Sequence, residues 1–132
     1  MKNNVVFGFV KMGININTSR NITLNGNVVA NVGEREVIIF DMATDLGAGI
    51  SACGYTEGDF CSDIKVLNNI VAGVLFTGYV SFGHKCGDYS NPNFKNNVAH
   101  SIKGTGAIIF PDTSDSEQNN CMEGSYFSAY KV

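Results

Sequence analysis

The segment ITLNGNVVANV, from Ile22 to Val32, occurs in related form three times in the chain. The second copy is IKVLNNIVAGV, from Ile64 to Val74, and the third is PNFKNNVAHSI, from Pro92 to Ile102. Each copy carries an asparagine at the same place, and hydrophobic residues coincide when the copies are superposed on it. A repeat in constant register is typical of stacked structural units, each of which buries one face against the next.

The shared asparagine is Asn27, Asn69 or Asn97. The hydrophobic positions that coincide are Leu24, Val66 and Phe94, then Val28, Ile70 and Val98, and then Val32, Val74 and Ile102. The same register brings together Phe40, Phe82 and Phe110, each thirteen residues after its asparagine. The flanking segments EREVIIF and GTGAIIF also agree, so the similarity extends over nearly the whole repeat.

Short runs of Val, Ile and Phe between Gly and Asn predict three strands in each repeat. The first strand ends at the asparagine and is expected at Asn21–Leu24, Asp63–Val66 and Asn93–Phe94. The second follows it, at Val28–Val32, Ile70–Val74 and Val98–Ile102. The third ends at the shared phenylalanine, at Val37–Phe40, Tyr79–Phe82 and Ala107–Phe110.

Three short strands in about 20 residues, with no helix between them, are typical of an all-β parallel β-helix. In that fold each strand pairs with the equivalent strand of the next coil, about 4.8 Å away. Asparagine at a corner tolerates left-handed backbone angles and can bond to its neighbours along the stack. We therefore predict a structural ladder of Asn27, Asn69 and Asn97; the alternative is that they are ordinary exposed turn residues.

The asparagines are 42 and 28 residues apart, so the repeats carry insertions. These are expected directly after the shared phenylalanine, at Asp41–Ser62, at Gly83–Asn91 and from Pro111 past Cys121, and they emerge at one corner. Every cysteine of the chain falls in them, namely Cys53, Cys61, Cys86 and Cys121. Of the three possible pairings, the spacing favours a Cys53–Cys61 and a Cys86–Cys121 disulfide.

Composition narrows the class of protein. The chain has 132 residues, 44% hydrophobic and 16% charged, with a net charge of −3, which argues against nucleic-acid binding. It contains no long apolar run typical of a membrane span. Asn17 and Asn21 each begin an N-glycosylation triplet, and with an even number of cysteines they favour an oxidising, secretory context.

The two ends of the chain are expected to be partial coils. We expect one coil to end at Val5–Val10 and the next to begin at Ile14–Ile16. A further coil is expected to begin at Ser125–Val132. Neither end shows a polar cap over its strand edges. The N-terminus also lacks a signal peptide. Residues 1–132 are therefore expected to be a single β-helix segment of a longer protein, stacked at both ends against the rest of its polypeptide.

Several segments resemble the fibrocystin and fibrocystin-like proteins of the polycystic kidney and hepatic disease type. They are DMATD at Asp41–Asp45, GHKCGDYSN at Gly83–Asn91, NNVAHSIKGTGAIIFPD at Asn96–Asp112 and CMEGSYFSAYKV at Cys121–Val132. The resemblance covers most of the chain and implies a right-handed parallel β-helix in the ectodomain of a single-pass, cell-surface protein, displayed on cilia or similar surfaces. The immunoglobulin-like repeats and the membrane anchor of full members are missing from this sequence.

A few side chains are candidates for chemistry. His100 occupies a position where the other repeats have Ala30 and Ala72, and is either a functional group or a satisfied structural residue. His84 lies near Cys86 and Asp88, but without zinc-ligand spacing. The acidic residues Asp41, Asp45, Asp59, Asp63 and Asp112 lack the alternation of a calcium loop, and polar loop positions explain them equally well.

Two further patterns have ordinary explanations. The glycines of Leu46-Gly47-Ala48-Gly49 are not followed by a helix and do not form a phosphate loop. Aromatic residues that could line a sugar-binding groove, but that suit core packing as well, are Tyr55, Phe60, Tyr79, Tyr89, Tyr126 and Phe127.

The sequence therefore favours a non-catalytic, extracellular structural or adhesion scaffold without a metal or cofactor. Its expected partners are extracellular proteins or glycans. The alternative is part of a polysaccharide-binding or polysaccharide-cleaving, hyaluronidase-like β-helix enzyme. That alternative requires carboxylates and a histidine to converge on one face, and Asp41, His84, Asp88 and Asp112 form the only plausible set.

Overall fold

A computed structural model describes residues 1–9, 12–16, 19–32, 47–52, 62–84, 92–111 and 124–130. Within these ranges the regular structure consists of strands, and no helix occurs. No helix of the described residues is long and apolar enough to cross a membrane. The strands are β1 (Val5–Phe9), β2 (Met12–Ile16), β3 (Arg20–Asn25), β4 (Val28–Val32), β5 (Ala48–Ala52), β6 (Ser62–Leu67), β7 (Ile70–Val74), β8 (Thr77–His84), β9 (Phe94–Lys95), β10 (Val98–His100), β11 (Thr105–Pro111), β12 (Gly124–Ser125) and β13 (Ser128–Tyr130).

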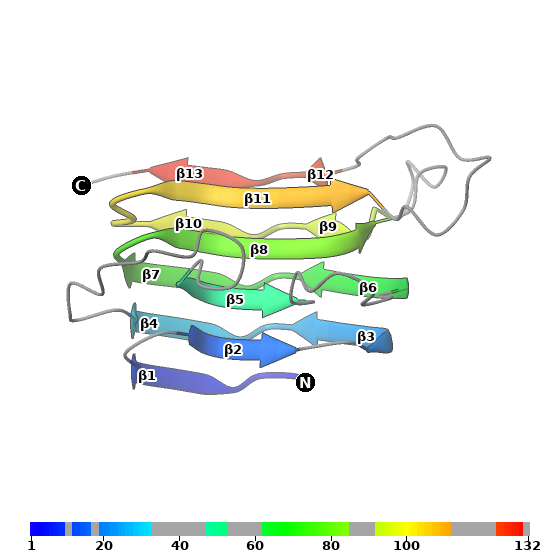
Figure 1. Ribbon diagram of the computed structural model, residues 1–132, viewed down its shortest axis with the longest axis horizontal. Helices are drawn as coiled ribbons and strands as arrows, with labels where there is room; N and C mark the ends of the chain where they lie inside the picture. Colours follow the sequence, from blue (N-terminus) through cyan, green and yellow to red (C-terminus); the bar gives the residue numbers. More distant parts are fainter. Residues whose placement is uncertain are drawn as a thin grey trace, which may run out of the picture.

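The strands form three parallel sheets that the chain visits in rotation (Figure 1). The first sheet has the order β1-β4-β7-β10-β13, the second β2-β5-β8-β11 and the third β3-β6-β9-β12. Each strand therefore pairs with the strand that comes three elements later in the chain. The prediction of an all-β fold with parallel pairing between repeats is confirmed.

The pairing register follows the predicted superposition of the repeats. Leu24 pairs with Val66, and Val66 pairs with Phe94, in the third sheet. In the first sheet Ile70 lies between Val28 and Val98. These side chains recur at equivalent places because a one-residue shift would turn every inward residue of a strand outward.

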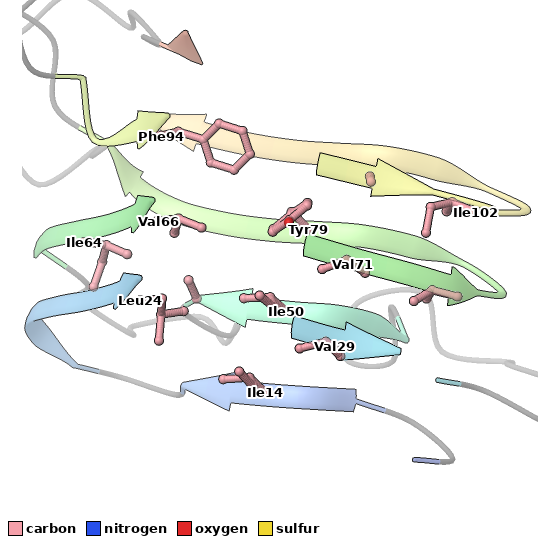
Figure 2. Packing of buried hydrophobic residues seen from close by; sticks show 13 residues of the cluster. Ile14, Leu24, Val29, Ile50, Ile64, Val66, Val71, Tyr79, Phe94 and Ile102 are labelled. Carbon is pink, nitrogen blue, oxygen red and sulfur yellow. The ribbon is translucent and has the colours of Figure 1, made fainter. Parts of the chain in front are cut away.

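The hydrophobic core lies between the sheets and is drawn in Figure 2. Fully buried side chains recur at each level, for example Leu24, Val66 and Phe94 from the third sheet. Tyr79 lies among them, and its ring meets the ring of Phe94 edge-on with centroids 5.6 Å apart. The core thus extends without a break along the direction in which the strands are stacked.

The predicted place of the third strand of the first repeat is wrong, because β5 occupies it. The strand that pairs with β8 is β5, with Ile50 opposite Tyr79 and Ala52 opposite Ser81, whereas the prediction placed residues 48–52 inside an insertion. The predicted strand Val37–Phe40 lies outside the described residues. The predicted insertion Asp41–Ser62 is therefore also wrong as a single loop, because it contains β5 and the first residue of β6.

A column of glycines explains why residues 48–52, and not EREVIIF, form the strand next to β8. The residue pairs before and after them place Gly49, Gly78 and Gly106 opposite one another in the neighbouring strands β5, β8 and β11 of the second sheet. A Cβ on Gly49 would lie 2.2 Å from Val71 Cγ1, and one on Gly106 would lie 2.8 Å from the Ala129 Cβ. The first and second sheets approach so closely here that only glycine fits, and EREVIIF has no glycine to offer at this place.

The backbone of each second strand enters the left-handed region near the end of the strand. Asn31 and Ser101 have φ of 55° and 54°, and Gly73 has φ of 63°, which is the left-handed region. Asn31 and Gly73 lie one residue before the ends of β4 and β7, whereas β10 ends at His100, directly before Ser101 and two residues before the predicted Ile102. The other insertions begin after β8 and β11, which run to His84 and Pro111.

Candidate functional site

Among the described residues, a column of buried asparagines lies at the corner between the third and first sheets. Asn27, Asn69 and Asn97 are each fully buried. Asn69 Oδ1 accepts from the backbone N and from Nδ2 of Asn27, both at 2.9 Å. Asn97 Oδ1 accepts in the same way from the backbone N of Asn69 at 3.0 Å and from its Nδ2 at 3.1 Å.

The backbone adds a third bond at every step of the column. Ile70 N donates to Asn27 O and Val98 N donates to Asn69 O, both at 2.9 Å. The side-chain oxygen of each ladder asparagine thus accepts from the backbone N–H of the preceding ladder asparagine, a turn peptide group that would otherwise lack an acceptor. Because the groups are buried and hydrogen-bonded, they avoid the cost of an unsatisfied polar group.

The column contains a fourth asparagine that was missed in the sequence. Asn27 Oδ1 accepts from the backbone N of Asn4 at 3.1 Å and from Asn4 Nδ2 at 2.9 Å. Asn4 directly precedes Val5, which pairs with Val28. The signal was present as the dipeptide Asn3-Asn4, which matches Asn68-Asn69 and Asn96-Asn97.

A second, exposed column lies beside the buried one. Asn68 Nδ2 donates to Asn25 Oδ1 at 2.9 Å, and Asn96 Nδ2 donates to Asn68 Oδ1 at 3.0 Å. Both Asn68 and Asn96 have φ of 55°, a conformation that asparagine tolerates better than most residues. Each Asn-Asn pair thus supplies one residue that makes the turn and one that forms the ladder.

Tyr79 joins the asparagine column to the hydrophobic core. Its hydroxyl lies 2.8 Å from Asn69 O and 2.9 Å from Val98 O, so a single O–H is shared between two carbonyl acceptors. Burial raises the pKa of Tyr79 well above its usual range, because the phenolate would be desolvated. Tyr79 was a candidate for a sugar-binding groove, and the structure places it in the core instead.

Tyr79 predicts how stability changes in alkali. In the unfolded chain a tyrosine ionises near pH 10, whereas folded Tyr79 keeps its proton to higher pH. The folded state therefore loses stability as pH rises above about 10, by up to about 1.4 kcal/mol per pH unit. We expect Tyr79→Phe to remove this contribution while costing about 1 kcal/mol at neutral pH. Urea unfolding between neutral pH and pH 11, with Tyr126→Phe as the exposed control, measures both, and an unchanged alkaline slope in Tyr79→Phe would contradict the assignment.

The C-terminal strands carry an aromatic cluster in place of the ladder. Ser128 pairs with Val98, so Phe127 occupies the position of the ladder asparagine. Its ring centroid lies 5.5 Å from that of Phe94 and 6.1 Å from that of Tyr79. Tyr126, the neighbouring candidate, is exposed and has a φ of 53°, which is unusual for an aromatic residue.

His100 lies on the outer face of the first sheet. It pairs with Ala72, as the sequence predicted, while its neighbour Ala99 is buried inward. The ring of His100 stacks on that of Tyr130, with centroids 5.5 Å apart and planes 10° from parallel. Its Nδ1 lies 3.5 Å from the Ser101 hydroxyl oxygen.

Most of the remaining candidate residues lie outside the described part of the chain. This applies to the four cysteines, and so to both predicted disulfides, to the glycosylation candidate Asn17, to the aromatic residues Tyr55, Phe60 and Tyr89, and to the acidic residues Asp41, Asp45, Asp59, Asp88 and Asp112. His84 ends β8 and Asp63 lies in β6. Gly47, Ala48 and Gly49 form the start of the β5 region and are buried.

Within the described ranges no group of three or more His, Cys, Asp or Glu side chains is placed to hold a metal ion. Asn21, the other glycosylation candidate, is exposed in β3 with a φ of 56°. The chain was compared with protein-family models, with curated proteins and with solved structures, and no match was found in any of the three.

Proposed function

We propose that residues 1–132 form a segment of a right-handed parallel β-helix, with about three complete coils and partial coils at the ends. The observation that supports this most directly is the rotation of the chain through three parallel sheets, with the asparagine column at one corner. In this arrangement hydrogen bonds run along the axis and the core is continuous, so the segment resists bending. A stiff element of this kind is suited to a structural role.

We further propose that the segment serves as a non-catalytic scaffold in the ectodomain of a fibrocystin-like, cell-surface protein. The proposal draws on the sequence resemblance and on the glycosylation triplets. Loops that leave such a coil at one corner present a surface for extracellular proteins or glycans. In the proposed protein the disulfides Cys53–Cys61 and Cys86–Cys121 hold these loops in place.

The glycosylation triplet at Asn21 gives a test of the secretory placement. Because the Asn21 side chain is exposed, we expect the chain to carry an N-glycan there when it is directed into the secretory pathway of a eukaryotic cell. Intact-mass and peptide analysis before and after glycosidase treatment measures occupancy. Asn21→Asp should remove this glycan, whereas Asn15→Asp, on an exposed asparagine outside a triplet, should not. A fully secreted chain without a glycan at Asn21 would count against the placement.

A second candidate function is polysaccharide binding, favoured by the outward His100–Tyr130 stack. The Tyr130 ring stacks with one side on His100 and is about half exposed, so its other side offers an apolar surface to the face of a sugar ring. Incubation with hyaluronan and with pectin-type polymers separates the possibilities. The scaffold proposal predicts an unchanged polymer size distribution. Depolymerisation that is lost in Asp41→Ala or His84→Ala would overturn it, and retention on the polymer that is lost in Tyr130→Ala would support the binding function.

A further inference from the structure

The outer face of the first sheet is apolar and lacks charged side chains. Over their described lengths, the five strands β1, β4, β7, β10 and β13 contain no Asp, Glu, Lys or Arg. The third sheet, by contrast, carries Arg20, Lys65 and Lys95. Ile70 belongs to β7, the middle strand of the first sheet, and is still 40% exposed. The apolar surface is therefore a property of the side of the stack and does not depend on its ends.

Strand pairing arranges the outward residues of this sheet in two columns that run along the stack. The first column consists of Val5, Val28, Ile70, Val98 and Ser128. The second consists of Phe7, Ala30, Ala72, His100 and Tyr130. The residues between the columns point inward and are buried, for example Val29, Val71 and Ala99. Because alanine has the shortest of these side chains, the second column is lowest at its middle two positions. We call the two columns together the apolar strip.

The exposed asparagine column borders the apolar strip. Asn68 and Asn96 each precede a member of the first column by two residues. Asn68 Nδ2 donates to Asn25 Oδ1, and Asn68 Oδ1 accepts from Asn96 Nδ2. A primary amide has two N–H donors and two acceptor lone pairs. One donor and one acceptor position of Asn68 therefore have no partner among the described residues, and neutral hydrogen-bonding groups line this edge of the strip.

This combination suits a neutral, extended polysaccharide. The C–H face of a sugar ring packs on apolar side chains, and its hydroxyl groups exchange hydrogen bonds with amides. An extended β-linked chain advances with each sugar by about the strand spacing of 4.8 Å, so successive rings can meet successive coils. A polyanion such as hyaluronan finds no lysine or arginine in the strip to offset the desolvation of its carboxylates.

A protein partner suits the strip less well. Outward residues of one strand are about 7 Å apart, so the strip is only two side chains wide. A stable protein interface buries on the order of 800 Å² on each partner. A second copy of this chain would therefore have to cover the exposed polar residues at the corners as well, namely Asn31, Asn68 and Asn96, and would leave some of their amides unsatisfied.

We propose that the apolar strip and the exposed asparagine column bind a neutral, extended, β-linked polysaccharide that runs along the stack. Its sugar rings lie over Ala30 and Ala72, and the amides of Asn68 and Asn96 bond to its hydroxyl groups. The inference rests on polysaccharide binding, the second candidate function above, and assigns to that function a neutral polymer in place of an anionic one.

Isothermal titration calorimetry of the full chain with cellohexaose tests the proposal. Maltohexaose is the α-linked control, which curves, and a hyaluronan hexasaccharide is the anionic control. We expect binding of cellohexaose alone, with a Kd that does not change with salt concentration because no charges pair across the contact. Equal affinity for maltohexaose, or an affinity for cellohexaose that falls steeply with salt, would overturn the proposal.

Three variants locate the site on the molecule. Ala72→Glu places bulk and charge in the middle of the strip and should raise the Kd for cellohexaose by about tenfold. Asn68→Gly keeps the left-handed turn but removes one amide, and should raise the Kd by about fivefold. Thr105→Glu introduces the same carboxylate at an exposed position of the second sheet and should leave the Kd unchanged. The thermal midpoint of each variant confirms that it is folded, and equal effects of Ala72→Glu and Thr105→Glu would contradict the assignment.

The remaining outcomes separate this inference from the proposals above. Binding of the hyaluronan hexasaccharide without binding of cellohexaose would overturn the inference and leave polysaccharide binding in place. Absence of binding to all three sugars would overturn both, without affecting the scaffold role. Self-association in sedimentation equilibrium that Ala72→Glu abolishes would assign the strip to a second copy of the chain and would overturn the choice of occupant.

Discussion

Replacing Asn69 with leucine is expected to destabilise the protein by about 4 kcal/mol, because the change breaks the buried column at its centre. Leucine has a similar volume but removes the oxygen that accepts from the backbone N and Nδ2 of Asn27. It also removes the Nδ2 group that donates to Asn97 Oδ1 and to Leu24 O, and leaves only the backbone N of residue 69 as a donor to Asn97 Oδ1. The backbone N–H of Asn27 would then be buried without its acceptor, and chemical unfolding followed by circular dichroism measures the loss.

The neighbouring Asn68 provides the matched control. It forms the same type of side-chain bond with Asn25 and Asn96, but it is exposed to solvent. We expect Asn68→Gly to cost less than about 1 kcal/mol, because water replaces the lost bonds and glycine adopts the left-handed conformation easily. Equal losses at Asn68 and Asn69 would show that the column contributes through turn geometry alone.

Gly78→Ala is expected to destabilise the protein by about 3 kcal/mol and to lower Tm by roughly 10 °C. The new Cβ would lie 2.4 Å from the carbonyl oxygen of Gly106 and 3.0 Å from the Ala99 Cβ. The nearer contact is with the backbone of β11, so relief requires the strands β8 and β11 to separate. Differential scanning calorimetry measures the shift.

Two further variants test the cause of that loss. Ala72→Val adds two methyl groups on the outer face of the first sheet, where Ala72 is partly exposed, and should change Tm little. The double variant Gly78→Ala with Ala99→Gly removes the farther contact but keeps the nearer one with the Gly106 carbonyl. We therefore expect only slight rescue. Full rescue would place the clash between the two sheets instead of between neighbouring strands.

Much of the fold could be predicted because the repeat can be recognised in the amino-acid sequence. The registers of Leu24 with Val66 and of Val28 with Ile70 follow directly from superposing the copies on their asparagines. The strands β4 and β7 occupy the predicted residues. These features depend on side-chain type at successive positions, which a linear comparison of the copies detects.

The third strand of the first repeat could not be found in this way. EREVIIF resembles GTGAIIF in its hydrophobic residues. Which segment forms the strand next to β8 depends instead on the close approach of Val71, in the first sheet, to Gly49, in the second. That requirement involves residues from separate strands and has no local pattern in the sequence. For the same reason, the covering of the core by Phe127 was not apparent from its residue type.

The repeated pattern of residues is enough to predict the parallel repeat and the positions of Asn27, Asn69 and Asn97, because equal side chains at equal spacing pair in register. The folded arrangement is needed to see which segment becomes β5, that Asn4 extends the column, and that Phe127 takes the ladder position in the last described coil. These outcomes depend on contacts between residues far apart in the chain, such as the 23 positions between Asn4 and Asn27. The space available between sheets and the hydrogen-bonding direction of the ladder exist only once the strands have been brought together.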